Sequence, residues 1–401
     1  MPKQAVLLAA GKSSRFFPFS IKESKVETVL MGKPILYWTL DSLIEAKIKK
    51  VVVVVNQSNS RTKSLLKDYV QNFEKLEIAI QKEARGMADA ILAAKDLLDE
   101  HFFVMNASQV NAADYLQKMI NLNSSSALAA TATDNPKIYG VVSIEGVKAI
   151  SLIEKPQQKI KNPYRIIGIY LLNRDFLNYM SSLPAEEYLL ETALNNYMQK
   201  HEVKVAKFEK TPASLKYPWH LLDLKNELFQ KFKFSISKQA KISPTALIKG
   251  DVYIGPEAIV ADYAIVEGPA YIGKKAVVGQ HCILRKGSVL EDRAEVQRFA
   301  DVANSILMTD AHCHSGFIGD SVLGQGVRIG AGFISANRRL DRATVKTVVK
   351  AKKTDSKRKN LGVIMGHNVK VGVQSSTMPG VIIKNEAVIE PGSIIKKNIN
   401  Q

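Results

Sequence analysis

The chain has 401 residues and a formal net charge of +18, with 46% hydrophobic and 23% charged residues. This composition is typical of a soluble globular protein with two or three domains. No apolar run approaches the length of a membrane span, and two cysteines, Cys282 and Cys313, are too few for a disulfide framework. With no signal-peptide pattern at the N-terminus, these features predict a cytoplasmic protein without a membrane anchor.

The strong positive charge predicts anionic partners, such as nucleotides, sugar phosphates, coenzyme A or nucleic acid. Aromatic residues make up only 7% of the chain, and no RNA-stacking motif is present. Small phosphorylated ligands are therefore favoured over nucleic acid.

The apolar run 5–10 reads as a buried strand that ends at Gly11. Gly11 allows a sharp turn, Ser13 and Ser14 keep the next side chains small, and Arg15 adds a fixed positive charge. The loop is either a phosphate cradle or an ordinary strand–turn with an exposed arginine.

Alternating helical and strand-like runs predict an α/β domain over residues 1–230, with a parallel sheet between helices. We expect strands at 51–55, 102–105, 127–132 and 165–172, and helices at 36–46, 87–98 and 189–200. A polar linker, 231–241, follows.

Residues 242–401 carry an aliphatic residue at every sixth position, without a break from Ile242 to Val302 and again from Met365. A small residue usually stands four positions after each aliphatic one. A six-residue period is the signature of a parallel β-helix, in which three short strands form each coil. We expect the aliphatic side chains inside the coils and the small residues at tight corners.

Two irregular insertions are expected in the β-helix. Residues 307–317 contain His312, Cys313 and His314, a cluster that suggests zinc but lacks a second ligand pair at metal spacing. Residues 338–360 contain ten Lys or Arg against two Asp, which fits either a solvated loop or a ligand-binding one.

Several motifs follow one another in a recognisable order. They are Ala9-Ala10-Gly11 with Ser13-Ser14-Arg15-Phe16, Lys25, Gly32-Lys33-Pro34, Gly86-Met87-Ala88-Asp89, Tyr139-Gly140, Glu154-Lys155-Pro156, Tyr217-Pro218-Trp219 and Ile329-Gly330-Ala331-Gly332. The first half resembles the sugar-1-phosphate nucleotidyltransferases. The whole chain resembles the bifunctional N-acetylglucosamine-1-phosphate uridyltransferase and glucosamine-1-phosphate acetyltransferase family of archaeal type, which implies a Rossmann-like α/β domain followed by an all-β left-handed β-helix.

The resemblance implies a site for nucleotidyl transfer in the first half. Arg15 and Lys25 would neutralise a nucleoside triphosphate, UTP or dTTP. Its nucleotide-binding residues would be Ala10, Gly11, Ser13, Ser14, Gln81 and Gly86, and its sugar-phosphate residues Gly140, Glu154 and Lys155.

The implied Mg²⁺ site is incomplete. Ser108 stands where the family has a metal-binding aspartate, and His220 replaces a second aspartate. Asn226 remains as a weak metal ligand, with Asp223 as an alternative, although Mg²⁺ prefers carboxylate oxygens. Asp114 lies close to Ser108 in sequence, but nothing in the sequence shows that it reaches the site.

For the second half, the resemblance implies acetyl transfer from acetyl-coenzyme A with His314 as the base. Arg285, Asn337 and Lys346 would bind the sugar phosphate, whereas Ala303 and Phe317 replace a family lysine and tyrosine. Related β-helix proteins form homotrimers with sites between subunits.

Two alternatives stay open. One is an enzyme with a single activity, such as a glucose-1-phosphate nucleotidyltransferase with a regulatory β-helix. The other is a non-catalytic nucleotide-binding or RNA-associated scaffold. The serine at position 108 in place of the metal-binding aspartate and the net charge of +18 would favour this alternative.

Overall fold

The computed structural model describes residues 2–21, 24–83, 85–158, 160–184 and 188–400. The chain divides into two compact units, one with Met1–Lys12 and Ile35–Ala213 and the other with Ser13–Pro34 and Ser214–Gln401. Within the described residues, every helix is too short or too polar to cross a membrane.

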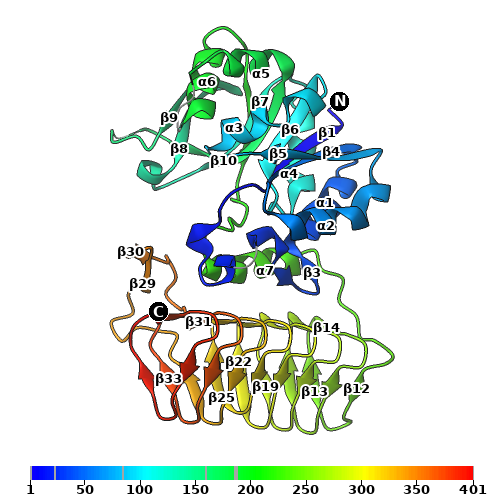
Figure 1. Ribbon diagram of the computed structural model, residues 1–401, viewed down its shortest axis with the longest axis vertical. Coiled ribbons are helices and arrows are strands. Elements are labelled where there is room, and N and C mark those ends of the chain that lie inside the picture. The colour runs from blue at the N-terminus through cyan, green and yellow to red at the C-terminus, as the bar shows by residue number, and fades with distance from the viewer. Residues whose placement is uncertain (1, 22–23, 84, 159, 185–187, 401) are drawn as a thin grey trace. The chain divides into compact units, whose positions relative to one another are not determined.

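The first unit is built on a nine-stranded mixed sheet in the order β5-β4-β1-β6-β10-β7-β11-β9-β8 (Figure 1). Its strands are β1 (Gln4–Leu8), β4 (Lys50–Asn56), β5 (Lys75–Gln81), β6 (His101–Asn106), β7 (Ala127–Ala132), β8 (Gly140–Glu145), β9 (Lys148–Glu154), β10 (Tyr164–Asn173) and β11 (Lys204–Phe208). β1 pairs in parallel with both β4 and β6. The four strands expected from the apolar runs are confirmed.

The helices of this unit are α1 (Ile35–Glu45), α2 (Ser60–Leu66), α3 (Met87–Leu92), α4 (Ala112–Ile120), α5 (Arg174–Ser181) and α6 (Leu189–Met198). The single helix expected over 87–98 is wrong, because α3 ends at Leu92 and a separate 3₁₀ turn covers Lys95–Leu97. Ala94 and Leu98 are nevertheless buried, so the apolar pattern marked the buried face but not the helix end.

The second unit contains a parallel β-helix made of three sheets, which confirms the repeat-based prediction. The first β-helix sheet holds β12 (Lys241–Ile242), β15 (Ile259–Val260), β18 (Val277–Val278), β21 (Glu295–Val296), β24 (His312–Cys313), β27 (Arg328–Ile329), β32 (Lys370–Val371) and β35 (Val388–Ile389). The second holds β13 (Leu247–Lys249), β16 (Ile265–Glu267), β19 (Ile283–Leu284), β22 (Ala300–Ala303), β25 (Gly316–Gly319), β28 (Phe333–Ser335), β33 (Ser376–Thr377) and β36 (Ile394–Ile395). The third holds β14 (Val252–Ile254), β17 (Ala270–Ile272), β20 (Ser288–Leu290), β23 (Ile306–Leu307), β26 (Val322–Leu323), β31 (Ile364–Met365) and β34 (Ile382–Ile383).

The aliphatic residues of the repeat fill the interior of the coils, as Val260, Val266 and Ile272 illustrate with 0–1% exposure. The expected insertion at 307–317 is wrong, because β23, β24 and β25 continue the three sheets in register. Here some corners are one residue shorter, so the six-residue period slips while the coil itself continues.

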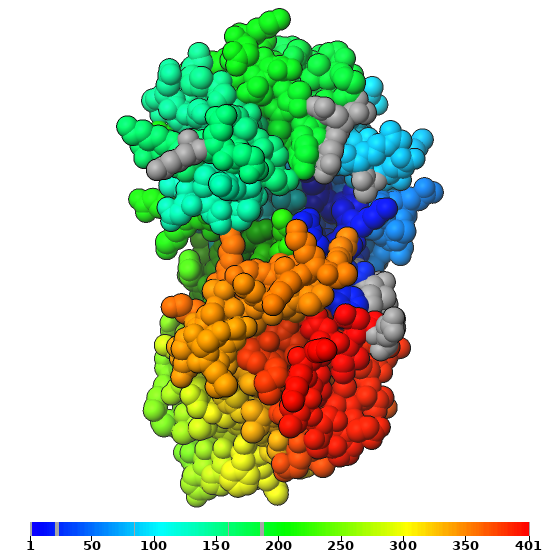
Figure 2. All heavy atoms as spheres, turned by 90° about the vertical axis from the view of Figure 1, so that its left-hand side faces the viewer, coloured from blue at the N-terminus to red at the C-terminus, as the bar shows by residue number. Residues whose placement is uncertain are grey.

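The basic segment 338–360 does leave the coil. An isolated bridge between Arg338 and Asn360 closes its base, and β29 (Lys346–Val349) pairs with β30 (Lys352–Asp355) as a hairpin. Figure 2 shows this segment in orange lying against the last coils in red, where Asn398 Nδ2 donates to the carbonyl of Val348 at 2.9 Å. The insertion is therefore a fixed part of the β-helix surface.

The outer face of the third β-helix sheet is buried within the second unit by α7 (Leu221–Phe229) and by residues 24–34, which include the short strands β2 (Val29–Leu30) and β3 (Lys33–Pro34). Glu291, 1% exposed, accepts hydrogen bonds from the backbone N–H groups of Met31 at 2.5 Å and Gly32 at 2.9 Å. This carboxylate fixes the segment that carries Arg15 and Lys25 onto the β-helix.

We expect Glu291→Ala to lower the free energy of unfolding by about 2–4 kcal/mol, because two N–H groups lose their acceptor. Burial raises the pKa of Glu291 to about 7, so the native state holds an extra proton between the unfolded pKa and that value. The contribution of this group to stability therefore falls as the pH rises through that window. Urea unfolding at pH 5.5 and 8 should show a smaller pH dependence in Glu291→Gln, and an unchanged dependence would contradict this role.

Candidate functional sites on the two units

The loop after β1 is held by two asparagine side chains. Asn56 Nδ2 and Asn59 Nδ2 each donate, at 3.3 Å, to the carbonyls of Ala10 and Ala9 respectively. Ala10 is buried, whereas Gly11 is exposed and a Cβ there would meet nothing within 4 Å. The first part of the predicted phosphate loop is thus a fixed turn with an open side.

The rest of this loop belongs to the second unit. Ser13 adopts the left-handed conformation with φ of 50°, and a 3₁₀ turn over Ser14–Phe16 follows. Phe16 is buried and anchors the turn, which leaves the Arg15 side chain exposed. An exposed guanidinium beside main-chain N–H groups suits an anionic ligand.

Lys25 lies near Arg15 in the same unit. Its Nζ donates to the carbonyl of Leu215 at 3.1 Å. Burial, then the charges of Arg15 and Lys216, lower the pKa of Lys25 to about 8. The positive charges of Arg15 and Lys216 beside Lys25 make this part of the second unit suitable for a polyphosphate.

Nucleotide affinity should depend on pH through Lys25. The ammonium form is present below pH 8 and is lost above it, so UTP affinity should fall up to about tenfold per unit above pH 8. Equilibrium dialysis between pH 7 and 10 measures this. Lys25→Arg should remove the fall, because guanidinium stays charged. A decline of equal steepness in the variant would exclude Lys25 as its cause.

The predicted base-binding segment is an ordered turn in the first unit. Buried Gln81, at the end of β5, donates from Nε2 to the carbonyl of Gly86 at 3.2 Å and to Asp89 at 2.8 Å. Gly86 has φ of 122°, a value that suits only glycine, and it precedes α3. The structure therefore brings Gln81 and Gly86 together as the resemblance implies.

The predicted sugar residues also meet on one hairpin of the first unit. Gly140 of β8 lies opposite Glu154 of β9, and a Cβ on Gly140 would be 2.8 Å from a Glu154 carboxylate oxygen. Lys155 Nζ contacts Glu154 at 3.3 Å and the hydroxyl of Tyr188 at 3.0 Å. These contacts raise the pKa of Lys155, so it remains a cation beside a hydrogen-bonding carboxylate.

The residues suggested for Mg²⁺ do not fit a carboxylate-based metal site. Ser108 follows β6 and is only 5% exposed. Asn226 Oδ1 accepts a hydrogen bond from the buried ammonium of Lys225 at 2.9 Å, and the Asp223 carboxylate is paired with Arg358. Burial lowers the pKa of His220 to about 4.

Among the described residues, no three His, Cys, Asp or Glu side chains lie close enough together to hold a metal. Because the side-chain oxygen of Asn226 is already bound by the Lys225 ammonium, these groups do not fit a Mg²⁺ site.

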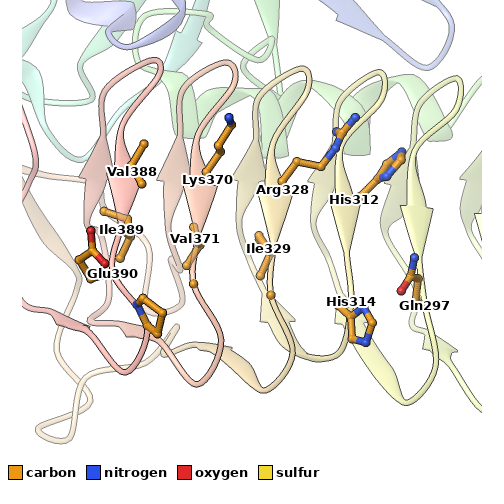
Figure 3. A pocket seen from close by; sticks show the side chains of 13 residues that line it. Gln297, His312, His314, Arg328, Ile329, Lys370, Val371, Val388, Ile389 and Glu390 are labelled. Carbon is orange, nitrogen blue, oxygen red and sulfur yellow. The ribbon is translucent and has the colours of Figure 1, made fainter.

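The β-helix carries a cavity of about 530 Å³ over its first sheet (Figure 3). Its lining residues are Gln297, His312, His314, Arg328, Ile329, Gly330, Lys370, Val371, Gly372, Val388, Ile389, Glu390 and Pro391. Gly330 and Gly372 stand at consecutive corners, where a Cβ would lie within 3 Å of the backbone of the next coil. His314, Arg328 and Lys370 provide polar groups. A base and positive charge in one groove fit a phosphorylated substrate.

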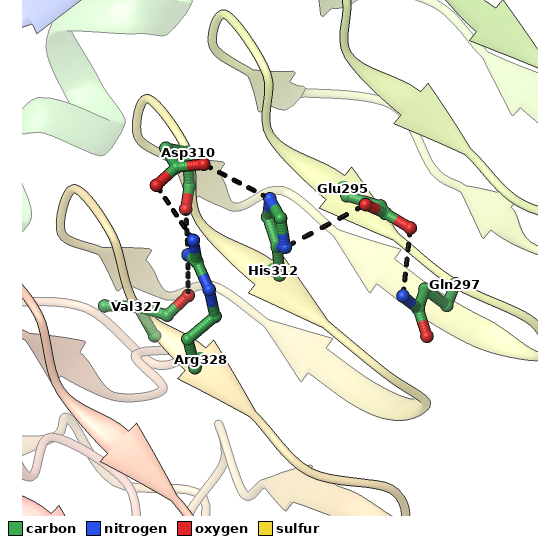
Figure 4. Close-up of polar contacts among 6 residues, drawn as sticks. All are labelled: Glu295, Gln297, Asp310, His312, Val327 and Arg328. Atoms are coloured by element: carbon green, nitrogen blue, oxygen red, sulfur yellow. Dashed lines mark hydrogen bonds and ion pairs between the residues drawn. The ribbon is translucent and has the colours of Figure 1, made fainter.

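The two histidines of this cavity have different surroundings. Figure 4 shows His312 between the carboxylates of Asp310, at 3.4 Å, and Glu295, at 3.8 Å. His314 is exposed at the corner after β24, where its backbone N–H donates to Ile329. Cys313 between them faces the interior, and burial raises its pKa to about 12. The alternating directions favour His314 as the base and speak against a zinc site.

Three further predicted residues are not among those that line this cavity. Arg285, after β19 of the second sheet, pairs with Asp301. Asn337 donates from Nδ2 to buried Asp320 at 2.7 Å, which directs its carbonyl oxygen away from that carboxylate. Lys346 is exposed on the hairpin. One chain therefore does not bring these three residues into the groove of His314.

Arg328 and Lys370 were missed by motif reasoning. They follow His312 in the same column of the first sheet, because His312 pairs with Arg328 and Arg328 with Lys370. An alignment of the coils by register would have revealed this column. Nothing in the sequence marks the shorter corners that set the register.

The relatives found by comparison with known proteins match the sequence of both units. A family model for nucleotidyl transferases matches residues 4–219. Over 400 residues the chain is 34% identical to "Bifunctional protein GlmU" of Methanocaldococcus jannaschii, covering 98% of this chain and 95% of the relative. It is 30% identical over 403 residues to "Bifunctional sugar-1-phosphate nucleotidylyltransferase/acetyltransferase" of Sulfurisphaera tokodaii, covering 99% and 98%.

The chain therefore belongs to the nucleotidyl transferase family, in the branch of these full-length bifunctional proteins. A solved structure from Bacillus anthracis, titled a glucose-1-phosphate thymidylyltransferase, covers 58% of this chain and 97% of its own. Its TM-score is 0.51 at 20% identity, which is a likeness of fold alone.

Proposed function

We propose that the chain makes an activated N-acetyl sugar in two steps. The β-helix transfers the acetyl group of acetyl-coenzyme A to glucosamine 1-phosphate, and the first half joins the product to UTP with release of pyrophosphate. The observation that carries the proposal is the relation to bifunctional proteins over 98% of the chain, since it covers both units. The chain thus functions as a transferase with two activities.

In the first reaction, the sugar amine attacks the thioester carbonyl, a C–N bond forms, and the C–S bond to coenzyme A breaks. His314 takes the proton that the amine loses. The exposed imidazole in an open groove is accessible to that amine. Arg285, Asn337 and Lys346 bind the sugar phosphate in this proposal.

In the second reaction, a sugar-phosphate oxygen attacks the α-phosphorus of the triphosphate. Arg15 and Lys25 neutralise charge on the phosphates, while the backbone of residues 10–14 binds their oxygens. Gln81 and Gly86 hold the base, and Gly140, Glu154 and Lys155 bind the sugar phosphate. Each residue acts by binding or orientation, so none has to exchange a proton.

We propose that the second reaction depends on Mg²⁺, which would shield charge on the phosphates, and that the absent carboxylate makes this reaction slow. Ser108→Asp should then raise turnover at limiting Mg²⁺ by tenfold or more, since carboxylate oxygens bind Mg²⁺ better than a hydroxyl. Pyrophosphorolysis measured across a Mg²⁺ titration tests this, with Ser124→Asp as the control for added charge. Unchanged turnover would show that Ser108 does not limit metal binding.

Ser108 also favours a second candidate function, in which only acetyl transfer remains. The two half-reactions assayed separately distinguish it, because that protein would acetylate glucosamine 1-phosphate without releasing pyrophosphate from UTP.

We further propose a left-handed β-helix and a cytoplasmic homotrimer. The outer face of the second β-helix sheet supports self-association, since Leu247, Ile334 and Ile394 are exposed by 45%, 52% and 60%. A partner copy could then supply the residues that one chain leaves outside the groove of His314. Both cysteines are free and buried, which suits a reducing compartment.

A further inference from the structure

Three rings form an exposed row along the corner between the first and second β-helix sheets. Tyr263 stacks on His281 with ring centroids 5.1 Å apart, and His281 stacks on Phe299 at 5.3 Å, with interplanar angles of 12° and 7°. Tyr263 is 58% exposed and Phe299 is 68% exposed. The row therefore occupies solvent-accessible surface and is not part of the core.

Corner geometry alone does not require rings at these positions. The three residues have φ between 55° and 58°, a left-handed region that bulky residues rarely adopt. At the corner between the third and first β-helix sheets, Glu257, Lys275 and Arg293 of successive coils have the same left-handed conformation. All three of these residues are charged and none carries a ring. Rings have thus been placed at one corner only, at some conformational cost, which points to a use.

The row stops next to the candidate base. Asp301 pairs with Phe317 in the next coil. Two residues before this pair, Ser315 therefore occupies in the next coil the position that Phe299 has in its own coil. The Ser315 hydroxyl accepts a hydrogen bond from the N–H of Gly332 at 3.0 Å, which ties this small side chain to the coil beyond. Hence no ring of the described row covers the second face of Phe299.

His314 lies at the same edge. Val296 pairs with Cys313, so Gln297 and His314 occupy equivalent positions in adjacent coils, and both line the cavity. Figure 3 shows these two side chains next to each other at one end of the groove. Phe299 lies two residues after Gln297, and the open position at Ser315 lies one residue after His314. Both positions are therefore close in sequence to residues that line the cavity.

We propose that the free face of Phe299 is a stacking platform for the apolar face of a phosphorylated amino-sugar ring, above Ser315 and beside His314. The face of an aromatic ring is apolar and electron-rich, so it suits contact with the C–H groups on one face of a pyranose. Adjacent coils lie about 4.8 Å apart, so a sugar ring over Ser315 continues the spacing of the row. His281 stiffens the platform from the other side.

This assignment rests on the proposed acetyl transfer and names a residue that selects its acceptor. Arg285 lies on the neighbouring second sheet, two residues after Ile283, which pairs with Asp301. Its guanidinium lies outside the groove of His314 and is held by Asp301, which follows Phe299 by two residues. A cation on that side of Phe299 suits the phosphate of a sugar that stacks on this ring. The acceptor class is therefore a pyranose with one face free of polar groups and an anionic substituent.

The test compares Phe299→Ala, Phe299→Trp and Tyr263→Ala, the last as a matched loss of an exposed ring at the far end of the row. We expect Phe299→Ala to raise the KM for glucosamine 1-phosphate about tenfold while the KM for acetyl-coenzyme A stays unchanged. Phe299→Trp should keep the low KM for glucosamine 1-phosphate, because a ring remains, and Tyr263→Ala should have the KM of the unaltered protein. Equal KM values in all four proteins would overturn the assignment.

Saturation-transfer NMR with glucosamine 1-phosphate separates this idea from the proposed function. Transfer from aromatic protons to the ring protons of the sugar, lost in Phe299→Ala, supports the platform even if no acetylated product forms. Product without such transfer leaves the function standing and overturns the platform. A change of oligomeric state in Phe299→Ala, seen by light scattering, would show that a second copy covers the ring and would also overturn it.

Discussion

His314→Ala should lower kcat for acetyl transfer by about a thousandfold, because a positioned base contributes a factor of that order. Its imidazole is the exposed one in the groove, whereas His312 is held between two carboxylates. Uridylyl transfer by the same variant should be unchanged, since His314 has no part in it. Coupled detection of the free thiol of coenzyme A measures the first rate, and pyrophosphate release measures the second.

His312→Gln is the matched control, two residues away and also lining the groove. We expect a change of less than about threefold in acetyl transfer, because this ring already contacts Asp310 and Glu295. A thousandfold loss in His312→Gln with normal activity in His314→Ala would exchange their roles. An equal small loss in both would remove the proposed base altogether.

Arg15→Ala should lower kcat/KM for uridylyl transfer by a factor of about 10²–10³, the range for removing one charged group that stabilises the transition state. Arg15 is exposed on a turn that buried Phe16 anchors, so its loss should leave the fold intact. Acetyl transfer should continue at its normal rate. Pyrophosphate release from UTP and N-acetylglucosamine 1-phosphate gives the measurement.

Arg293→Ala serves as the control for Arg15, because it removes the same charge from an exposed β-helix corner. This variant should keep both activities. If Arg15→Ala behaved like Arg293→Ala, the basic turn would be an ordinary exposed loop and the phosphate-binding proposal would fail.

The repeat made the β-helix predictable because each interior position has to be filled by an aliphatic residue, as Val260, Val266 and Ile272 show. The shorter corners between Val302 and Leu323 could not be predicted in the same way. Losing one corner residue shifts the period, yet strand pairing holds the coil together. The sequence therefore suggested an insertion where the structure has an unbroken coil.

The burial of charged side chains and the identity of their partners also could not be predicted from the sequence. Lys225 lies in α7 between the buried residues Leu224 and Leu228, and a lysine at such a position is expected to extend its ammonium to solvent. It is instead fully buried, with Nζ 2.6 Å from Asn304 Oδ1, in a coil 79 residues further along the chain. Burial and then the charge of Arg358 lower its pKa to about 7. Such partners depend on tertiary packing, which no local pattern records.

In the candidate sites too, contacts between neighbouring segments differ in predictability from contacts that depend on tertiary packing. Gln81 lies against Gly86 and Gly140 lies opposite Glu154, so the structure brings together residues that the resemblance assigned to the same ligand. The column of Arg328 and Lys370 above His312 depends on coil register and escaped motif reasoning. Contacts within a motif could be predicted, while contacts between coils had to be observed.

The most direct test of the account is a single incubation of the purified full chain with glucosamine 1-phosphate, acetyl-coenzyme A, UTP and Mg²⁺, followed by mass spectrometry of the nucleotides. We expect UDP-N-acetylglucosamine to form, to disappear in His314→Ala, and to return in that variant when N-acetylglucosamine 1-phosphate is supplied. Absence of the product with either sugar phosphate in the unaltered protein would contradict the proposed function.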